Sequence, residues 1–309
     1  MDHFPFDGEG ILRIADAKAC GIDPRQIYQA ERDQRLVRVM PGVYVLPVER
    51  RPEQRHRLRV LAAQLPPATV VSHSSAAVVH GLGMLRPDLD QLHLTSVRGA
   101  AGYRRKMRYL HPGRLGEDDI VEVDGVPVTS KERTAFDVAR SSRWGFAGAL
   151  SVFDSALRAK ADRAVMEQFC LSRQAGVGVA RRALALADAR AENPGESWSR
   201  AQMIQAGISS PRLQTDVFDR HGTFLARPDF DWIDEAGAIK LVGEFDGLGK
   251  YLDYLRPGET AEDVIRREKE REGRLRDMEI LVVRWTWKDL MARAVAALVS
   301  KNLRLVGLV

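Results

Sequence analysis

The sequence has little cysteine and no long apolar run. Its two cysteines, Cys20 and Cys170, are too few for a disulfide framework or a four-thiolate zinc site. No stretch approaches the roughly 18 uninterrupted apolar residues that a membrane span needs. The acidic start also lacks the charged-then-apolar pattern of a signal peptide. These absences argue against a disulfide-stapled or membrane protein, and we expect a cytoplasmic protein with reduced thiols.

Lysine is also scarce, and most of the 47 basic residues are arginine. The planar arginine fork suits phosphate groups and base edges, although a GC-rich coding sequence would give the same bias. Residues 1–190 carry 29 Lys/Arg and 22 Asp/Glu, a net charge of +7, whereas residues 191–309 carry 18 and 20, a net charge of −2. A basic front and a mildly acidic back are compatible with nucleic-acid binding ahead of a metal-binding domain.

The chain of 309 residues is longer than a single domain usually is. Turn residues interrupt it near positions 50, 145 and 191, most clearly at Glu192-Asn193-Pro194-Gly195. We therefore predict an α/β multidomain protein. Its expected segments are a winged helix-turn-helix over residues 1–50, an α/β domain over 51–145, a helical connector over 146–190 and a mixed-sheet domain over 191–309.

The first segment has the pattern of a winged helix. A short helix over residues 15–20 is followed by Asp23-Pro24, an N-cap and a proline that start a second helix. Two short strands then flank Pro41-Gly42 and form the wing. Any amphipathic helix exposes polar residues, but the capped helix and the wing together favour DNA reading in a major groove. The predicted DNA-binding residues are Arg25, Gln26, Gln29 and Arg32 on the helix and Arg38 on the wing.

This part of the chain resembles a known family. Ile22-Asp23-Pro24-Arg25-Gln26-Ile27 and Pro41-Gly42-Val43-Tyr44 are similar to the N-terminal winged helix of AbiEi-type antitoxins. Val71-Ser72-His73-Ser74-Ser75 and Arg133-Thr134-Ala135-Phe136-Asp137 are similar to the two ends of the following AbiEi segment. The resemblance implies binding of double-stranded DNA, often at a protein's own promoter. It also makes a cognate toxin and a second copy of the chain candidate partners.

Two smaller features of this region have two interpretations each. The basic run Arg104, Arg105, Lys106 and Arg108 fits a phosphate backbone, but charges also protect the edge of a sheet. His73 and His80 share one helical face, yet no carboxylate or cysteine is spaced to complete a metal site. For these histidines the better account is Ser72 as a helix cap and His80 as a helix-end residue.

The last segment predicts a mixed sheet flanked by helices. We expect a helix from residue 195 to 204, strands over 212–218, 224–232, 239–246 and 280–285, a charged helix over 260–277, a final helix from 287 and a tail strand over 303–309. In the apolar strand 239–246, Glu244 and Asp246 lie on one face. Unpaired buried carboxylates are costly, and a divalent cation removes that cost. Asp229, Glu196 and Lys250 are expected to converge on the same point.

These residues resemble the PD-(D/E)xK nucleases, in particular the very-short-patch-repair-like branch. Pro228-Asp229, Glu244 and Arg284-Trp285-Thr286-Trp287 carry the resemblance, which covers about residues 191–300. It implies a restriction-endonuclease-like fold and hydrolysis of DNA phosphodiester bonds with Mg²⁺ or Mn²⁺. Asp229, Glu244 and Asp246 would form the metal site. The catalytic residues would be Glu196, Asp229, Glu244 and Lys250. The chain departs from the family pattern at Asp246, where a lysine is usual, and Lys250 is the nearest substitute.

Two functions follow from this pattern. The first is a metal-dependent DNA endonuclease that the winged helix directs to its site. The alternative is an AbiEi-type antitoxin and transcriptional repressor whose nuclease-like domain is catalytically inactive. Both functions include DNA binding, and neither defines the DNA sequence that the protein recognises.

Overall fold

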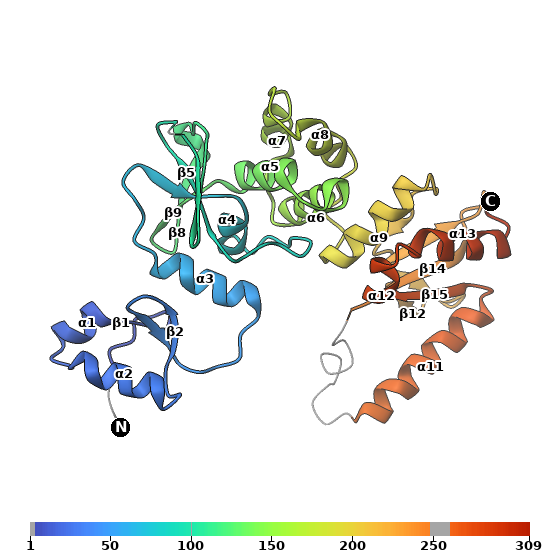
Figure 1. The fold of residues 1–309 in the computed structure, drawn as a ribbon. Helices are drawn as coiled ribbons and strands as arrows, with labels where there is room; N and C mark the ends of the chain where they lie inside the picture. Colours follow the sequence, from blue (N-terminus) through green and yellow to red (C-terminus); the bar gives the residue numbers. More distant parts are fainter. Residues whose placement is uncertain (1–3, 100, 248–259) are drawn as a thin grey trace. The chain divides into compact units, whose positions relative to one another are not determined.

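The computed structural model describes residues 4–99, 101–247 and 260–309 (Figure 1). The chain forms two compact units, Met1–Leu82 with Arg86–Val138 and Gly83–Leu85 with Ala139–Val309. In the part of the chain that is described, no helix is both long enough and apolar enough to cross a membrane. The predicted segments 1–50 and 51–145 thus lie largely in the first unit, and the predicted connector lies with the C-terminal domain in the second.

The first unit begins with the predicted winged helix. Its elements are β1 (Ile11–Arg13), α1 (Ile14–Ala19), α2 (Pro24–Arg32), β2 (Val37–Met40) and β3 (Val43–Val45). The three strands form an antiparallel sheet in the order β1-β3-β2. The sequence did not predict β1, because three residues are too short for a periodic pattern to stand out. Its Ile11 and Leu12 are nonetheless fully buried.

Local signals determine where α2 begins and how the wing turns. The Asp23 side chain accepts a hydrogen bond from the backbone N–H of Arg25 at 2.9 Å, and Pro24 occupies the first helical position. Gly42 has φ +75°, a conformation that favours glycine at the tip of the wing. The helix is anchored by Ile27 and Ala30, both of which are fully buried. The predicted capped helix and wing are therefore present.

A mixed sheet and its helices make up the rest of the first unit. The elements are α3 (Pro52–Ala62), β4 (Thr69–Val71), α4 (His73–Val79), β5 (Leu92–Ser96), β6 (Tyr103–Arg105), β7 (Arg108–His111), η1 (Glu117–Asp119), β8 (Ile120–Val123), β9 (Val126–Thr129) and α5 (Lys131–Ser141). The six strands run in the order β6-β7-β5-β4-β9-β8. β4 pairs parallel with β9 and β5 pairs parallel with β7, and the other pairs are antiparallel. This order leaves β6 at an edge.

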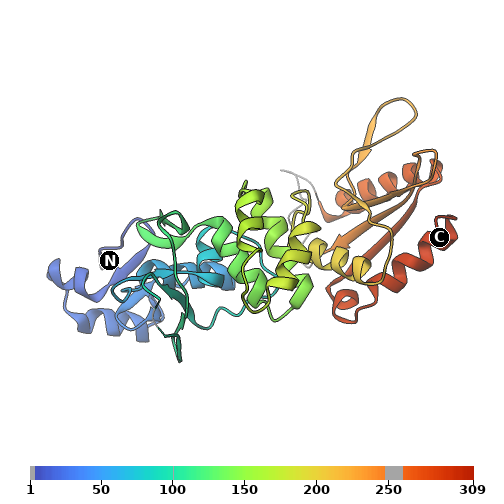
Figure 2. The same cartoon turned by 90° about the horizontal axis from the view of Figure 1, so that it is seen from above.

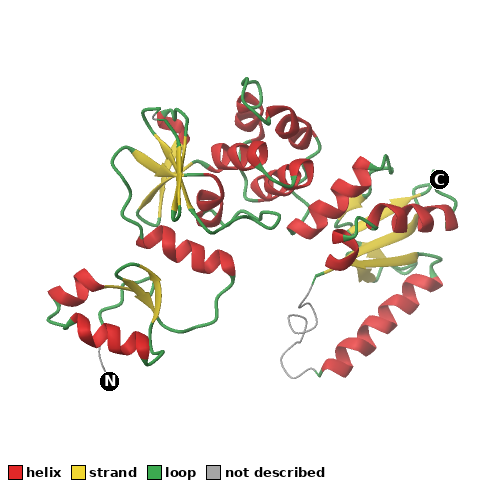
Figure 3. Cartoon of the chain, viewed as in Figure 1, coloured by secondary structure: helices red, strands yellow, loops and turns green. Residues whose placement is uncertain are grey.

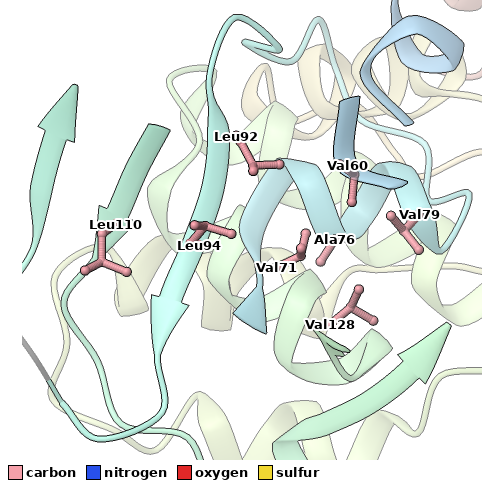
Figure 4. Packing of buried hydrophobic residues seen from close by; sticks show 8 residues of the cluster. All are labelled: Val60, Val71, Ala76, Val79, Leu92, Leu94, Leu110 and Val128. Carbon is pink, nitrogen blue, oxygen red and sulfur yellow. The ribbon is translucent and has the colours of Figure 1, made fainter. Parts of the chain in front are cut away.

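An apolar core lies between this sheet and its helices. Side chains from α3, α4 and four neighbouring strands point toward one another in it (Figure 4). The core residues are Val60, Val71, Ala76, Val79, Leu92, Leu94, Leu110 and Val128. Burial of these side chains fixes the register of the strands, because a shift by one residue would turn them to the opposite face.

The second unit starts with a helical segment. Its helices are α6 (Gly145–Arg158), α7 (Arg163–Phe169), α8 (Val177–Ala185) and α9 (Pro194–Gln205). Most of α6 is buried, and Arg200 of α9 forms an ion pair with Asp154 of α6 at 2.6 Å. The segment predicted to be a connector is therefore packed against the C-terminal domain.

A four-stranded sheet forms the centre of the C-terminal domain. The elements are β10 (Arg212–Leu213), β11 (Val217–Phe218), β12 (Phe224–Ala226), β13 (Phe230–Ile233), β14 (Ile239–Asp246), α11 (Ala261–Asp277), β15 (Leu281–Thr286), α12 (Trp287–Met291) and α13 (Val295–Leu305). The sheet order is β10-β13-β14-β15, with β14 and β15 parallel. Helix α11 covers one face of the sheet, and α9 and α13 lie on the other (Figure 3).

Three predicted strands of this domain differ from the observed ones. Residues 212–218 and 224–232 each form two short strands, and β11 and β12 pair as a separate hairpin that projects from the sheet (Figure 2). Gln214, with φ +52°, and Pro228, which lacks an N–H, interrupt the two runs. The predicted tail strand over 303–309 is wrong, because α13 continues to Leu305.

Candidate functional site

The outward face of α2 carries the predicted DNA-reading side chains. Arg25, Gln26, Gln29 and Arg32 are all exposed, while Ile27 and Ala30 face the core. The Gln29 side-chain amide donates to Asp33 Oδ1 at 2.7 Å. Arg38 is exposed on β2, the outer strand of the wing. The structure thus presents five polar side chains on a capped helix and its wing, the arrangement in which a winged helix offers residues to a DNA groove.

A second basic surface lies on the hairpin formed by β6 and β7. Arg104, Arg105 and Lys106 are exposed at its outer end. The Arg105 guanidinium lies 4.9 Å from the centre of the Tyr103 ring. Arg104 Nε donates to Gln91 Oε1 at 2.6 Å. The hairpin therefore holds its cations at the edge of the six-stranded sheet, a position compatible with both interpretations of the basic run.

Glu196 and Asp229 are brought together by Gln214. The side-chain amide of Gln214 donates to Glu196 Oε2 at 3.3 Å and to Asp229 Oδ1 at 3.2 Å. Asp229 Oδ2 also accepts from the backbone N–H of Phe245 at 2.7 Å, which places this carboxylate beside the end of β14. Gln214 was not predicted as a site residue, because its two partners are 18 and 15 residues away in the sequence.

The close approach of α9 to β14 buries Glu196. A Cβ atom on Gly195 would lie only 2.1 Å from the Phe245 ring, so glycine is required where the helix meets the strand. Glu196 is 2% exposed and accepts hydrogen bonds from the Glu192 N–H at 2.7 Å and from the Asn193 amide. Burial, followed by the negative charge of Asp229, raises the pKa of Glu196 to about 8. Burial and the charge of Asp229 therefore favour the protonated form of the Glu196 carboxyl group.

Glu244 is held by two arginines. Arg271 of α11 donates from Nη1 to Glu244 Oε1 at 2.7 Å and from Nη2 to Oε2 at 3.0 Å. Arg284 of β15, its neighbour in the parallel register, donates from Nε to Oε2 at 2.8 Å. Burial alone would raise the pKa of Glu244, but the hydrogen bonds and charges of Arg271 and Arg284 outweigh it and keep the pKa below its ordinary value. Glu244 is therefore an ionised carboxylate bound to two cations.

The predicted three-carboxylate metal site is not assembled. Within residues 4–99, 101–247 and 260–309, no three His, Cys, Asp or Glu side chains are grouped so that they could hold a metal ion. Asp229 and Glu244 have separate partners, and Asp246 lies half-buried two residues beyond Glu244 on β14. Lys250 falls outside the described residues. The donor set around Glu244 does not fit a divalent cation, because two guanidinium groups already occupy both carboxylate oxygens.

A histidine cluster in the first unit was not predicted. His56, His73, His93 and His111 come from α3, α4, β5 and β7, so no sequence spacing reveals it. The rings of His73 and His111 stack with centroids 3.5 Å apart, and His93 Nδ1 lies 2.9 Å from His111 Nε2. Burial lowers the pKa of both His56 and His93 to about 4. These two rings are therefore neutral at neutral pH.

The two residues singled out beside this cluster have different outcomes. Ser72 occupies the N-cap position of α4, but its side chain makes no capping hydrogen bond; instead its Oγ accepts from Thr95 Oγ1 at 2.7 Å. Ser72 is therefore the N-cap residue as predicted, but its side chain does not provide the capping hydrogen bond. His80 ends α4 as predicted, and its Nε2–H donates to the Thr129 carbonyl at 2.7 Å.

Two parts of the chain are similar to known protein families. Residues 4–47 match the family described as "Transcriptional regulator, AbiEi antitoxin", and residues 68–188 match "AbiEi antitoxin C-terminal domain". Two uncharacterized proteins of Mycobacterium tuberculosis, MT2308 of strain CDC 1551 / Oshkosh and Rv2248 of strain ATCC 25618 / H37Rv, are each 30% identical over 219 residues, which are 69% of this chain and 74% of the relative. The chain belongs to one family with these relatives, and two of its segments match AbiEi antitoxin domain families.

The AbiEi matches include some of the sites described above and not others. The α2 surface lies in the first matched segment, and the basic hairpin with His73, His93 and His111 lies in the second. The predicted AbiEi resemblance is therefore confirmed. Glu196, Asp229 and Glu244 lie beyond both matched segments, and their resemblance to nucleases stays a prediction.

Proposed function

We propose that the protein is a transcriptional regulator of the AbiEi antitoxin type that binds double-stranded DNA through α2. One observation carries the proposal: within a segment that matches an AbiEi transcriptional regulator, the capped helix buries its apolar residues and exposes two arginines and two glutamines. Arginine pairs with guanine and glutamine with adenine in a major groove. The word antitoxin in both family descriptions supports a cognate toxin as a protein partner.

Removing the two arginines of α2 should weaken specific DNA binding. In the Arg25→Ala/Arg32→Ala variant, each lost base contact is expected to cost about 1–3 kcal/mol of binding free energy. Fluorescence anisotropy at fixed salt, with DNA selected for binding to the wild-type protein, measures the change. The matched control is Arg173→Ala, which removes an exposed arginine of the second unit. Equal affinity of the double variant and the wild type would rule out α2 as the DNA-reading helix.

We further propose that the basic hairpin contacts DNA phosphates. The Arg105→Ala/Lys106→Ala variant should bind all DNA sequences more weakly, because phosphate contacts carry no sequence information. Its salt dependence, the slope of log K against log salt concentration, should fall by about 2. DNA titrations at several salt concentrations distinguish phosphate binding by the hairpin from a role in protecting the sheet edge. If the hairpin only protects the sheet edge, affinity and slope will remain those of the wild type.

The endonuclease alternative has its own test. We expect no nicking of supercoiled plasmid DNA in Mg²⁺ or Mn²⁺, because Glu244 is bound to two arginines and the carboxylates are not grouped around a cation site. Nicking by the wild-type protein that disappears in the Glu244→Gln variant would favour the nuclease. Nicking that persists in that variant would point to a contaminant.

A further inference from the structure

The ion network around Glu244 joins α11 to the C-terminal sheet. We propose that the guanidinium groups of Arg271 and Arg284 take the place of a divalent cation at Glu244, so that arginine rather than metal fastens α11 to β14 and β15. The inference goes beyond the proposed function, because it concerns residues outside both AbiEi-matched segments.

The contacts have the geometry of a complete carboxylate site. Arg271 binds Glu244 through two parallel hydrogen bonds, 2.7 and 3.0 Å long, and Arg284 adds a third of 2.8 Å. Arg284 also pairs with Glu272 of α11 at 3.4 Å. Two-pronged arginine–carboxylate pairs combine strength with fixed orientation. The network therefore defines how α11 is placed on the sheet as well as neutralising Glu244.

The two guanidinium groups leave a cation no favourable position at this carboxylate. Among the described contacts, Arg271 and Arg284 both bind Glu244, and Arg284 also pairs with Glu272. A divalent cation bound to Glu244 would lie within a few ångströms of two permanent positive charges, and the side chain of Glu244 is only 15% exposed. Repulsion between like charges is weakly screened in such a partly buried place. Binding of the metal would first require at least one arginine to leave.

The apolar contacts of α11 support the same assignment. Leu275, one turn beyond Arg271, is 1% exposed and packs with Val242, which lies two residues before Glu244 on the same face of β14. Two neighbouring contacts thus hold the helix against this face: the apolar contact of Leu275 with Val242 and the ion pair of Arg271 with Glu244. The packing of Leu275 against Val242 therefore also positions Arg271 beside Glu244.

The test measures Mn²⁺ binding and thermal unfolding in the full-length protein. The wild type should show no Mn²⁺ binding that depends on Glu244 and no shift of Tm with Mn²⁺. Arg271→Met should lower Tm without metal, because Glu244 loses its main partner. The same variant should gain Mn²⁺ binding about tenfold tighter than that of the wild type or more, since the freed carboxylate then favours a cation. Arg271→Lys, which keeps the charge, should gain much less.

Three comparisons decide the result. Arg274→Met, which removes an exposed arginine of the same helix, should behave like the wild type. Adding Glu244→Gln to Arg271→Met should abolish the gained Mn²⁺ binding. If the wild type binds Mn²⁺ and Glu244→Gln removes that binding, the proposal is wrong, and this comparison holds even if Arg271→Met fails to fold. An unchanged Tm in Arg271→Met would equally overturn it. None of these variants alters α2, so DNA binding reports on the proposed function separately.

Discussion

Replacing Arg200 by methionine is expected to lower the free energy of unfolding of the second unit by about 3–5 kcal/mol. Arg200 Nη2 donates to both carboxylate oxygens of Asp154, at 2.6 and 2.8 Å, and the two side chains are only 7% and 1% exposed. Without Arg200, Asp154 becomes a buried carboxylate without its cation. Urea denaturation followed by tryptophan fluorescence measures the loss, because all 5 tryptophans of the chain lie within residues 139–309.

An exposed ion pair of the same unit provides the control. Arg190 pairs with Asp188 at 2.6 Å, but its side chain is 60% exposed. Arg190→Met should therefore change the unfolding free energy by about 1 kcal/mol or less. Adding Asp154→Asn to Arg200→Met should restore part of the lost stability, since the amide is neutral. A loss as small for Arg200→Met as for Arg190→Met would show that the buried pair does not join α6 to α9.

Acidification should destabilise the first unit through its buried histidines. His56 and His93 have a pKa of about 4 in the folded protein, below the ordinary value of 6.5. Their contribution to the unfolding free energy is complete above pH 6.5 and is lost as the pH falls toward 4. In this range the unfolded chain binds protons at these histidines, whereas the folded unit keeps them neutral. The expected loss is about 3 kcal/mol of unfolding free energy for each histidine between pH 7 and pH 4.

Hydrogen exchange read by mass spectrometry measures this change in the full-length protein, because peptides report on each unit separately. His93→Gln should make the pH dependence of the first unit shallower, and the exposed His221→Gln of the second unit should leave it unchanged. A stability of the first unit that is flat from pH 7 to pH 4 would contradict the prediction.

Glu196 gives the second unit a contribution of opposite sign. Its pKa of about 8 lies above the ordinary carboxyl value of 4.5. The unfolded chain releases this proton as the pH rises from 4.5, whereas the folded protein retains it up to about pH 8. The contribution of Glu196 to the unfolding free energy therefore falls across this range, and Glu196→Gln should remove that component from the tryptophan-monitored profile.

The sequence by itself determined the start of α2, the bounds of β14 and the resemblance to AbiEi antitoxins. Asp23 and Pro24 define the start of α2 through one capping hydrogen bond and one fixed backbone angle, so three neighbouring residues are enough to predict it. The strand Ile239–Asp246 has the predicted bounds, because an apolar run between turn residues has few other structures available. Strand alternation also placed Glu244 and Asp246 on one face.

The tertiary structure decided which partners these residues have. Glu244 was predicted as a metal ligand, but its neighbours Arg271 and Arg284 are 27 and 40 residues away in the sequence and reach it only when α11 and β15 pack against β14. Gln214 joins Glu196 to Asp229 although the two carboxylates are 18 and 15 residues away from it in the sequence. Propensity and periodicity act over a few residues, whereas the charge and protonation of a buried group depend on every element packed around it. The start of α2, the bounds of β14 and the AbiEi resemblance were therefore predictable from the sequence, and the chemistry of the carboxylates was not.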